Sequence, residues 1–453
     1  LNNNNNNMNN KMESEPSEQK ERLYPGCCDD QERSQLIHLV NRSLNAQKQA
    51  NHANSRYWYP LSVPSYGVDE VLNAMDSLLR FETTMNRKVA DFEKRFANFV
   101  GAKHAVMVNS GSSADLLACF ACVTPGLALL APDDEILVPA LTWPTQIWSA
   151  AMAGLKVKTI DIDPTTLNSN VEQIEQAIGP QTKALFLVHL MGNPCQMEPI
   201  VSLCRRRGLV LLEDCCESLN ARSNGQHVGT FGAAGTFSFF FSHHLVTMEG
   251  GMVVTNDDRF ADALRMLRAH GWCRDMLNKP VVPMDRDARF TFTHWGFNVR
   301  PTELQGAFGQ VQLNRLVQFG QSRNRKFQLI QNYMGKHPEL QLPVPYSNTD
   351  PCWMFVPITV KPNQRFSRDQ LVNFLEQHGV ETRPVVVGDL KKQPAAEHFD
   401  FLRDSNHSGP ELIDQHAFIV GLHPDLEFPG NGFDTTGDVK RLLETFDRFF
   451  QQL

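Results

Sequence analysis

The sequence lacks several features that would assign it to a class at once. No apolar run reaches the roughly 18 residues of a membrane-spanning helix, so no membrane partner is expected. The 43 Lys and Arg residues do not exceed the 50 Asp and Glu residues, and the net charge of −7 argues against a dedicated nucleic-acid binder. No basic stretch followed by an apolar stretch marks a secretory signal. We therefore expect a cytoplasmic protein, in which a few local donors would suffice to bind a small anionic ligand.

The ten cysteines do not suggest a disulfide or metal framework. Without a secretory signal, a set of disulfides is not expected. Cys119 and Cys122 have the spacing of a redox or metal motif, but they lie in an apolar helical stretch. No second CxxC lies nearby to complete a zinc site. The simpler interpretation is that both are small buried helix residues, and no metal site is expected.

The chain divides into three parts by composition. Its 453 residues are 42% hydrophobic and 21% charged, which is ordinary for a globular protein. Residues 1–55 are predicted to form a low-complexity tail and a helical extension over Asp30–His52. The Asn run near the start is interpreted as translated upstream sequence, with Met8 or Met12 as the true start. Residues 56–335 are predicted to form a large domain and residues 336–453 a small one.

In the large part, strand-like and helical segments alternate, which predicts an α/β fold with a mostly parallel sheet. Predicted strands are His104–Val108, Ile136–Pro139, Val157–Ile162, Ala184–His189, Val210–Glu213, Gly235–Phe241 and Gly251–Thr255. Residues 273–293 are predicted to form a loop. A helix is predicted from Pro301, at its first position, to Phe319, and to continue after a turn towards His337.

The texture changes from about Pro343 onwards. Strands are predicted over Trp353–Val360 and Val380–Val387, and helices over Ser367–His378 and Asp438–Gln451. This pattern predicts a smaller C-terminal α+β domain that closes over the first.

Three short segments carry candidate ligand-binding residues. Ser110–Ala114 joins a predicted strand to a helix, where free backbone N–H groups can bind phosphate, although Ser and Gly also make ordinary caps. Asp214 ends a buried-looking strand, and a carboxylate there points into the usual ligand crevice, where it could hold a pyridinium N–H. Trp143 follows another strand and could stack on a flat ring, or could belong to the core.

With the segment Gly235–Gly251, the order of these motifs resembles the DegT/DnrJ/EryC1/StrS family. This is the sugar-nucleotide branch of the fold-type I pyridoxal-phosphate enzymes, and the resemblance covers about residues 57–453. It implies a large mostly parallel-sheet domain with a smaller α+β domain. It also implies pyridoxal or pyridoxamine 5′-phosphate as the cofactor.

The resemblance assigns roles to individual cofactor-binding residues. They are Ser112 and Ser113 at the phosphate turn, Trp143 as the stacking aromatic, Asp214 as the partner of the pyridine nitrogen, Ser238 as a phosphate-binding hydroxyl, and Asn298 as the residue that reaches a neighbouring subunit's phosphate. The role of Asn298 implies a homodimer with shared active sites.

One departure from the aminotransferase pattern decides the expected reaction. His243 stands where aminotransferases of the family have the lysine that forms a Schiff base with the cofactor. Imidazole cannot form that bond, but it can act as a general base at neutral pH. The family's sugar 3-dehydratases resemble this chain in having paired histidines here, and they use noncovalent pyridoxamine phosphate. His243 is the expected base; either histidine could face the cofactor, and His244 could instead contact substrate. The alternative is a decayed or regulatory protein.

Two kinds of 3-dehydratase are known in the family. One acts on a CDP sugar with an iron–sulfur cluster and a reductase. The other acts on a GDP sugar without a cluster and recycles its cofactor with glutamate. A cluster needs several thiolates, and residues 265–300 offer only Cys273. The expected function is therefore C3 dehydration of GDP-4-keto-6-deoxymannose in deoxysugar or lipopolysaccharide synthesis, with the CDP-sugar enzyme as the alternative. Arg383 is a candidate partner of the nucleotide diphosphate, or a solvated surface residue.

Overall fold

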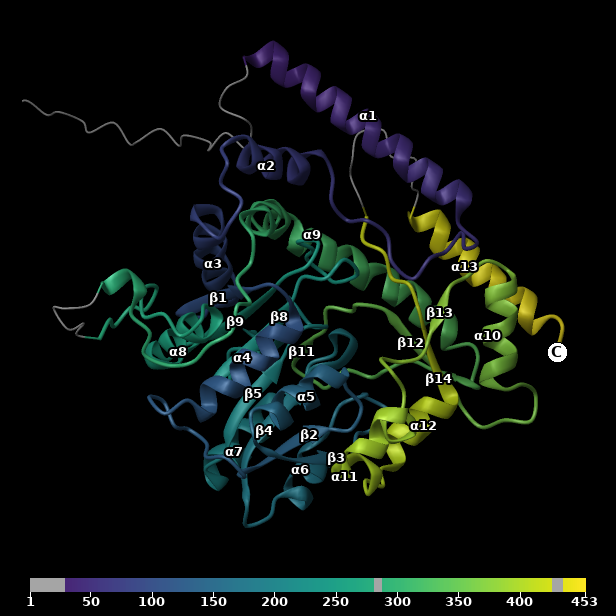
Figure 1. Cartoon of the computed structure of the whole chain (residues 1–453). Coiled ribbons are helices and arrows are strands. Elements are labelled where there is room, and N and C mark those ends of the chain that lie inside the picture. Colours follow the sequence, from purple (N-terminus) through teal and green to yellow (C-terminus); the bar gives the residue numbers. More distant parts are fainter. Residues whose placement is uncertain (1–28, 281–286, 426–434) are drawn as a thin grey trace, which may run out of the picture.

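The computed structural model describes residues 29–280, 287–425 and 435–453. The Asn-rich segment, Met8 and Met12 lie outside these ranges, so their interpretation stays a prediction. The predicted N-terminal helix is present as α1 (Asp30–Asn54), which lies beside α2 (Val68–Leu79) along one edge of the molecule (Figure 1). None of the helices in the described ranges combines the length and the apolar character needed to cross a bilayer.

A seven-stranded sheet forms the centre of the large part (Figure 1). Its order is β1-β9-β8-β5-β4-β2-β3, and only β9 runs antiparallel to its neighbours. The strands are β1 (His104–Val108), β2 (Glu135–Pro139), β3 (Lys156–Ile160), β4 (Thr182–Val188), β5 (Val210–Asp214), β8 (Ala234–Ser238) and β9 (Gly251–Thr255). The predicted mostly parallel α/β sheet is thus confirmed.

Helices cover both faces of this sheet, because its strands are apolar on both sides. In β4, Ala184 and Phe186 face one cluster of buried side chains, and Leu185 and Leu187 face another. The first cluster includes side chains of α4 (Gly111–Val123), α5 (Pro144–Met152) and α8 (Asp258–Arg268). The opposite face is covered by α3 (Arg87–Val100), α6 (Val171–Ala177), α7 (Met197–Arg207) and α9 (Glu303–Met334).

A second, antiparallel sheet lies at the other side of the molecule (Figure 1). Its order is β10 (Leu340–Gln341), β12 (Val356–Val360), β14 (Ala417–Val420) and β13 (Thr382–Arg383). It packs with α10 (Arg368–Gln377), α12 (Ser408–His416) and α13 (Thr435–Phe450). Tyr59 and the last turns of α9 contribute to the same core. Division of the chain at residues 55 and 335 stays a prediction.

Short elements complete the described chain. A small sheet contains β11 (Thr349–Asp350), β6 (Arg222–Ser223) and β7 (Gln226–His227). The remaining helical turns are η1 (Leu190–Gly192), η2 (Ala288–Phe290), η3 (Leu390–Lys392), η4 (Pro394–His398) and α11 (Asp400–Arg403). In the described part of the predicted loop at 273–293, the short helical turn η2 is the one helix or strand.

Helix α9 differs from the prediction in two respects: it has no interruption, and it begins at a later residue. It is continuous through Gly320, with no turn after Phe319. A Cβ at Gly320 would lie 3.0 Å from Cys352 Sγ, so the glycine serves close packing and does not mark a turn. The helix begins after Thr302, whose hydroxyl oxygen accepts from the Gln305 N–H in a capping box. Pro301 therefore precedes the cap and is not the first helical residue.

Two predicted strands end earlier in the structure than predicted. Of the strand predicted over Val380–Val387, only Thr382 and Arg383 form a strand, β13. Pro384 has no N–H to donate, and Val386 has a φ of 53°, so the extended ladder ends there. The strand predicted over Gly235–Phe241 ends at Ser238, where the chain turns into the cavity described below.

Candidate active site

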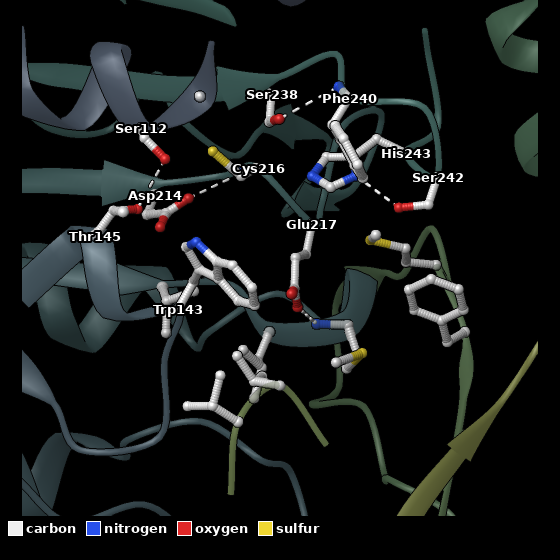
Figure 2. Close-up of a pocket in the computed structure, with 18 of the residues that line it drawn as sticks. Ser112, Trp143, Thr145, Asp214, Cys216, Glu217, Ser238, Phe240, Ser242 and His243 are labelled. Carbon is white, nitrogen blue, oxygen red and sulfur yellow. Dashed lines mark hydrogen bonds between the residues drawn. The ribbon is translucent and has the colours of Figure 1, made fainter. Parts of the chain in front are cut away.

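A cavity of about 720 Å³ lies where the parallel strands of the large sheet end. The ends of β4, β5 and β8 supply Val188, Asp214 and Ser238 to its wall. The opposite wall comes from the second sheet and its loops, through Phe355, Arg383 and Ile419 among others. The cavity therefore lies between the two sheets. Figure 2 shows Ser112, Trp143, Asp214, Cys216, Glu217, Ser238 and His243 around one common space.

One end of the cavity is formed by the first turn of α4. Ser110 caps this helix, and its Oγ accepts from the Ser113 N–H at 3.1 Å. The Ser112 hydroxyl lies in the wall and donates to Thr145 Oγ1 at 3.1 Å. A Cβ at Gly111 would stand 2.5 Å from Ser238 Cβ, so only glycine lets Ser238 close this end. Hydroxyls and free N–H groups at a helix N-terminus form an anion site.

Asp214 lies at the end of β5 and is only 3% exposed. Its Oδ1 accepts from the Cys216 N–H at 2.9 Å. A second buried carboxylate, Asp115 on α4, lies behind it and accepts from the Thr236 hydroxyl at 2.6 Å. The Asp115, Asp214 and Cys216 ligand atoms all lie within 4.8 Å of one another.

The two carboxylates cannot readily ionise together. Burial raises the pKa of both, and the charge of Asp214 raises the pKa of Asp115 further. The pair is therefore suited to hold one proton and to present a single negative charge to the cavity. Asp115 was not among the residues predicted for the site, because a polar residue within a helix gives no sequence signal of this contact.

Trp143 precedes α5 as its N-cap, and its side chain is 52% exposed. The ring borders the cavity, which excludes the alternative that Trp143 is a core residue. Figure 2 shows the indole beside Asp214 and Glu217, where it can cover a flat ligand.

His243 lies at the opposite end from the Ser112 hydroxyl and borders the cavity. Its Nδ1 lies 3.4 Å from Ser242 Oγ, and Figure 2 shows the other ring nitrogen on the side of Cys216 and Asp214. Burial, followed by the positive charge of Arg323, lowers the pKa of His243 to about 4. The imidazole is thus neutral at physiological pH and can accept a proton.

Glu217 is a cavity residue that the sequence argument missed. Its carboxylate accepts from the Met191 N–H at 2.9 Å and lies between Trp143 and His243 in Figure 2. Burial, followed by the charge of Asp214, raises the pKa of Glu217 to about 7. It can therefore gain or lose a proton near neutral pH. The sequence feature that could have indicated Glu217 as a cavity residue is its position three residues after Asp214.

Three predicted site residues do not border this cavity. Ser113 donates to Asn109 Oδ1 at 2.6 Å and so belongs to the turn that shapes the anion site. His244 is 1% exposed, and its Nε2 lies 2.7 Å from the Cys352 carbonyl oxygen. Asn298 pairs with Ala269 in an isolated bridge, and its Oδ1 accepts from Arg300 at 3.0 Å. Arg383 does border the cavity, but its guanidinium pairs with Glu381 at 2.6 Å.

A histidine, a glutamate and a cysteine form another buried cluster outside the cavity. His189, Glu213 and Cys215 are close enough to be candidate metal ligands. However, the Glu213 carboxylate already accepts from the N–H groups of Gly229, Phe231 and Gly232, each at 2.8 Å. This set of bonds gives Glu213 a structural task, to fix the chain before β8. Cys119 and Cys122 are buried in α4, as the simpler interpretation predicted.

Comparison with known proteins agrees with this architecture. The model of the DegT/DnrJ/EryC1/StrS aminotransferase family matches residues 67–427. The chain belongs to this family. The resemblance noted in the sequence, and the fold-type I architecture it implied, are therefore confirmed.

Similar members of the family are sugar dehydratases. A GDP-4-keto-6-deoxy-D-mannose 3-dehydratase of Escherichia coli O55:H7 is 37% identical over 372 residues, 81% of this chain and 95% of that protein. Its counterpart from Yersinia pseudotuberculosis is 35% identical over 81% of this chain and 94% of that protein. A crystal structure of GDP-4-keto-6-deoxymannose-3-dehydratase with a trapped PLP-glutamate geminal diamine has a TM-score of 0.79 and 35% identity, covering 85% of this chain and 99% of that one.

The residues of the cavity fit the cofactor of a DegT-family enzyme. The first turn of α4 and Ser238 form an anion site that a Cβ at residue 111 would fill. Trp143 and Asp214 suit the face and the ring nitrogen of a pyridine. Among the described residues that line the cavity there is no lysine, so these side chains would hold the group without a covalent bond.

Proposed function

We propose that the protein removes the C3 hydroxyl of a nucleotide-linked 4-keto-6-deoxyhexose, with pyridoxamine 5′-phosphate bound noncovalently. The observation that carries the proposal is His243, a neutral base in the cavity of a family whose aminotransferases have lysine there. Similarity to GDP-4-keto-6-deoxy-D-mannose 3-dehydratases over nearly their whole length supports a GDP sugar as substrate.

In this proposal, separate groups of residues bind the phosphate and the ring of the cofactor. Ser112, Ser238 and the first turn of α4 bind the cofactor's phosphate. Trp143 covers one face of its ring, and Asp214 accepts a hydrogen bond from the ring nitrogen. When bound, pyridoxamine phosphate would supply an amine for the sugar's keto carbon and a ring that delocalises the electron pair freed by proton removal, until the C3 hydroxide leaves with a pair.

His243 and Glu217 carry the proton chemistry of the proposal. The free nitrogen of His243 takes up a proton beside the bound ring, where its closeness matters more than its base strength. Glu217 is available as an acid because its pKa of about 7 keeps much of it protonated at neutral pH. Apolar side chains such as Phe355, Met354 and Ile419 line the opposite wall and exclude water from the reacting atoms.

The remaining roles concern the substrate, the amino donor and the subunits. Arg383 is proposed to bind the diphosphate after exchanging its partner Glu381 for phosphate oxygens. Glutamate is the proposed amino donor, supported by the glutamate adduct in the related structure. Asn298 borders no part of its own chain's cavity, which supports a contribution to the site of a second subunit in a homodimer. Deoxysugar and lipopolysaccharide synthesis in the cytoplasm is the proposed setting.

The direct test is turnover of defined nucleotide sugars. The protein is incubated with cofactor, glutamate and the 4-keto-6-deoxy sugars of GDP, CDP, dTDP and UDP. A 3-deoxy sugar and an equal amount of 2-oxoglutarate are expected, with the fastest turnover for the GDP substrate. His243→Ala serves as the matched control. An amino sugar without any 3-deoxy product would contradict the proposal.

The shared site has its own test. Inactive His243→Ala and Asn298→Ala variants are dissociated, mixed and reassociated. If each site uses Asn298 from the other subunit, half of the dimers contain one complete site, and about a quarter of wild-type activity returns. If Asn298 serves its own chain, the mixture stays inactive. Light scattering establishes whether the protein is dimeric at the assay concentration.

A further inference from the structure

A buried arginine lies behind the proposed base. Arg323, in the middle of α9, is 5% exposed. Its Nη1 donates to the backbone carbonyl oxygens of Met354, at 2.7 Å, and Leu422. Within residues 29–280, 287–425 and 435–453, no carboxylate forms an ion pair with it, and its Nε has no partner. Burial lowers the pKa of Arg323 to about 10, so it still carries its charge at neutral pH.

This arginine and His243 share a small cavity of about 10 Å³ next to the active site. Leu422 and His423 border the same space. Three histidines, His243, His244 and His423, have their pKa lowered first by burial and in each case also by the charge of Arg323. The guanidinium is thus a fixed positive charge that disfavours protonation of all three imidazoles.

The hydrogen-bond acceptors of Arg323 leave its positive charge uncancelled. A carboxylate would hold the guanidinium more strongly but would cancel its charge. Carbonyl dipoles satisfy part of its hydrogen-bonding capacity and leave the net charge in place. The other charged or titratable groups that line the two cavities are Asp115, Asp214, Cys216, Glu217, Glu249, Arg383 and His423. Arg383 is paired with Glu381, and burial holds the pKa of Glu217 near 7.

We propose that Arg323 is a positioning residue whose charge keeps His243 unprotonated while the active site holds anionic ligands. The inference rests on the proposed function, in which a phosphate and a nucleotide diphosphate enter the same cavity. Their negative charge favours a protonated imidazole, which could no longer accept a proton. Arg323 opposes this effect from the small neighbouring cavity that it shares with His243, because it does not border the larger cavity.

The test follows His243 itself in the full-length protein without substrate, both with and without pyridoxamine 5′-phosphate. Histidine is labelled with ¹⁵N, and the His243 signal is assigned by its loss in His243→Asn. In the wild type this signal should stay that of a neutral ring down to pH 5. In Arg323→Met the midpoint should rise by about one unit, and Arg323→Lys should return it towards the wild-type value. The acidic limb of the rate profile should move with it.

A matched control is available three residues along the same helix. Lys326 is also buried, donates to the His423 carbonyl oxygen at 2.7 Å and pairs with Asp425 at 2.7 Å. Lys326→Met removes a buried cation from α9 and should leave the His243 midpoint unchanged. A structural disturbance of α9 would move both variants alike.

Three results would overturn the inference. They are a wild-type His243 that titrates near pH 6.5, an unchanged midpoint in Arg323→Met, or a shift in Arg323→Lys equal to that in Arg323→Met. If Arg323→Met does not fold, the neutral variant Arg323→Gln takes its place in the same comparison with the wild type and Arg323→Lys. The measurement needs no turnover, so a protein that fails to dehydrate any sugar would refute the proposed function without affecting this result.

Discussion

Replacement of Asp115 by asparagine should stabilise the cofactor-free protein, because it removes one of two buried carboxyl groups that cannot readily ionise together. Asp115 and Asp214 lie within 4.8 Å of one another and are 2% and 3% exposed. Two unit charges at that distance repel by about 3.5 kcal/mol at an effective dielectric constant of about 20. The folded wild type avoids this repulsion by keeping a proton on the pair.

The sign of the pH dependence follows from that proton. In the unfolded chain both carboxyl groups ionise near pH 4. The folded pair has raised pKa values and retains one proton above that pH. The free energy of unfolding of the wild type therefore falls by about 1.4 kcal/mol per pH unit from this source. The loss stops when the folded pair releases its proton or when the repulsion of about 3.5 kcal/mol has been reached.

The assay is urea unfolding of cofactor-free protein at pH 5, 6, 7 and 8. Asp115→Asn should gain about 3 kcal/mol on the wild type between pH 5 and pH 7. The amide can still accept from the Thr236 hydroxyl, so the contact at that atom is kept. The control is Asp133→Asn, which makes the same chemical change on an exposed side chain. Equal pH dependence in Asp115→Asn and the wild type would refute the shared-proton argument.

Three further predictions concern the cavity. His243→Asn should lose dehydration while still binding cofactor. His243→Lys should bind PLP through a bond that borohydride reduction makes permanent and that mass spectrometry detects. His244→Gln should keep most activity because that ring is buried away from the cavity; loss of activity only in the His244 variant would reverse the assignment of the base. Gly111→Ala should weaken PLP binding at least tenfold, about 1.4 kcal/mol, because its Cβ would stand 2.5 Å from Ser238 Cβ; Gly126→Ala, whose Cβ would meet no atom within 4 Å, is the control in equilibrium dialysis. Glu217→Gln should abolish the change in cofactor absorbance expected between pH 6 and 8, since the carboxyl with a pKa of about 7 is gone; a transition that persists in the variant belongs to another group.

The parts of the site that follow a strand could be predicted from the sequence. Asp214 ends β5, Trp143 follows β2, and the anion site joins β1 to α4. Parallel strands bring these ends to one edge, so the alternation of strands and helices was enough to place them together. Ser238 and His243 were placed by the family resemblance, and both border the cavity.

The residues that could not be predicted depend on contacts between distant segments. Asp115 lies on a helix, and its burial arises from Thr236 on β8 and Asp214 on β5, each about 100 or more residues away. Nothing in the sequence marks Arg323, because helical periodicity does not reveal which cation of a long helix will be buried. The turn expected near Gly320 was wrong for a similar reason: a small residue can serve close packing instead of a change of direction.

The side chains of the two adjacent acidic residues at the end of β5 point in opposite directions. The Glu213 side chain holds the N–H groups of Gly229, Phe231 and Gly232, whereas the next side chain, Asp214, faces the cavity. Side chains alternate along a strand, so a slip of β5 by a single residue would exchange the two. The ligand would then lose its acid and the turn before β8 its anchor in the same event. The pairing of β5 with its neighbours therefore sets both the acid in the cavity and the anchor of the turn, and an insertion or deletion within this strand would displace both.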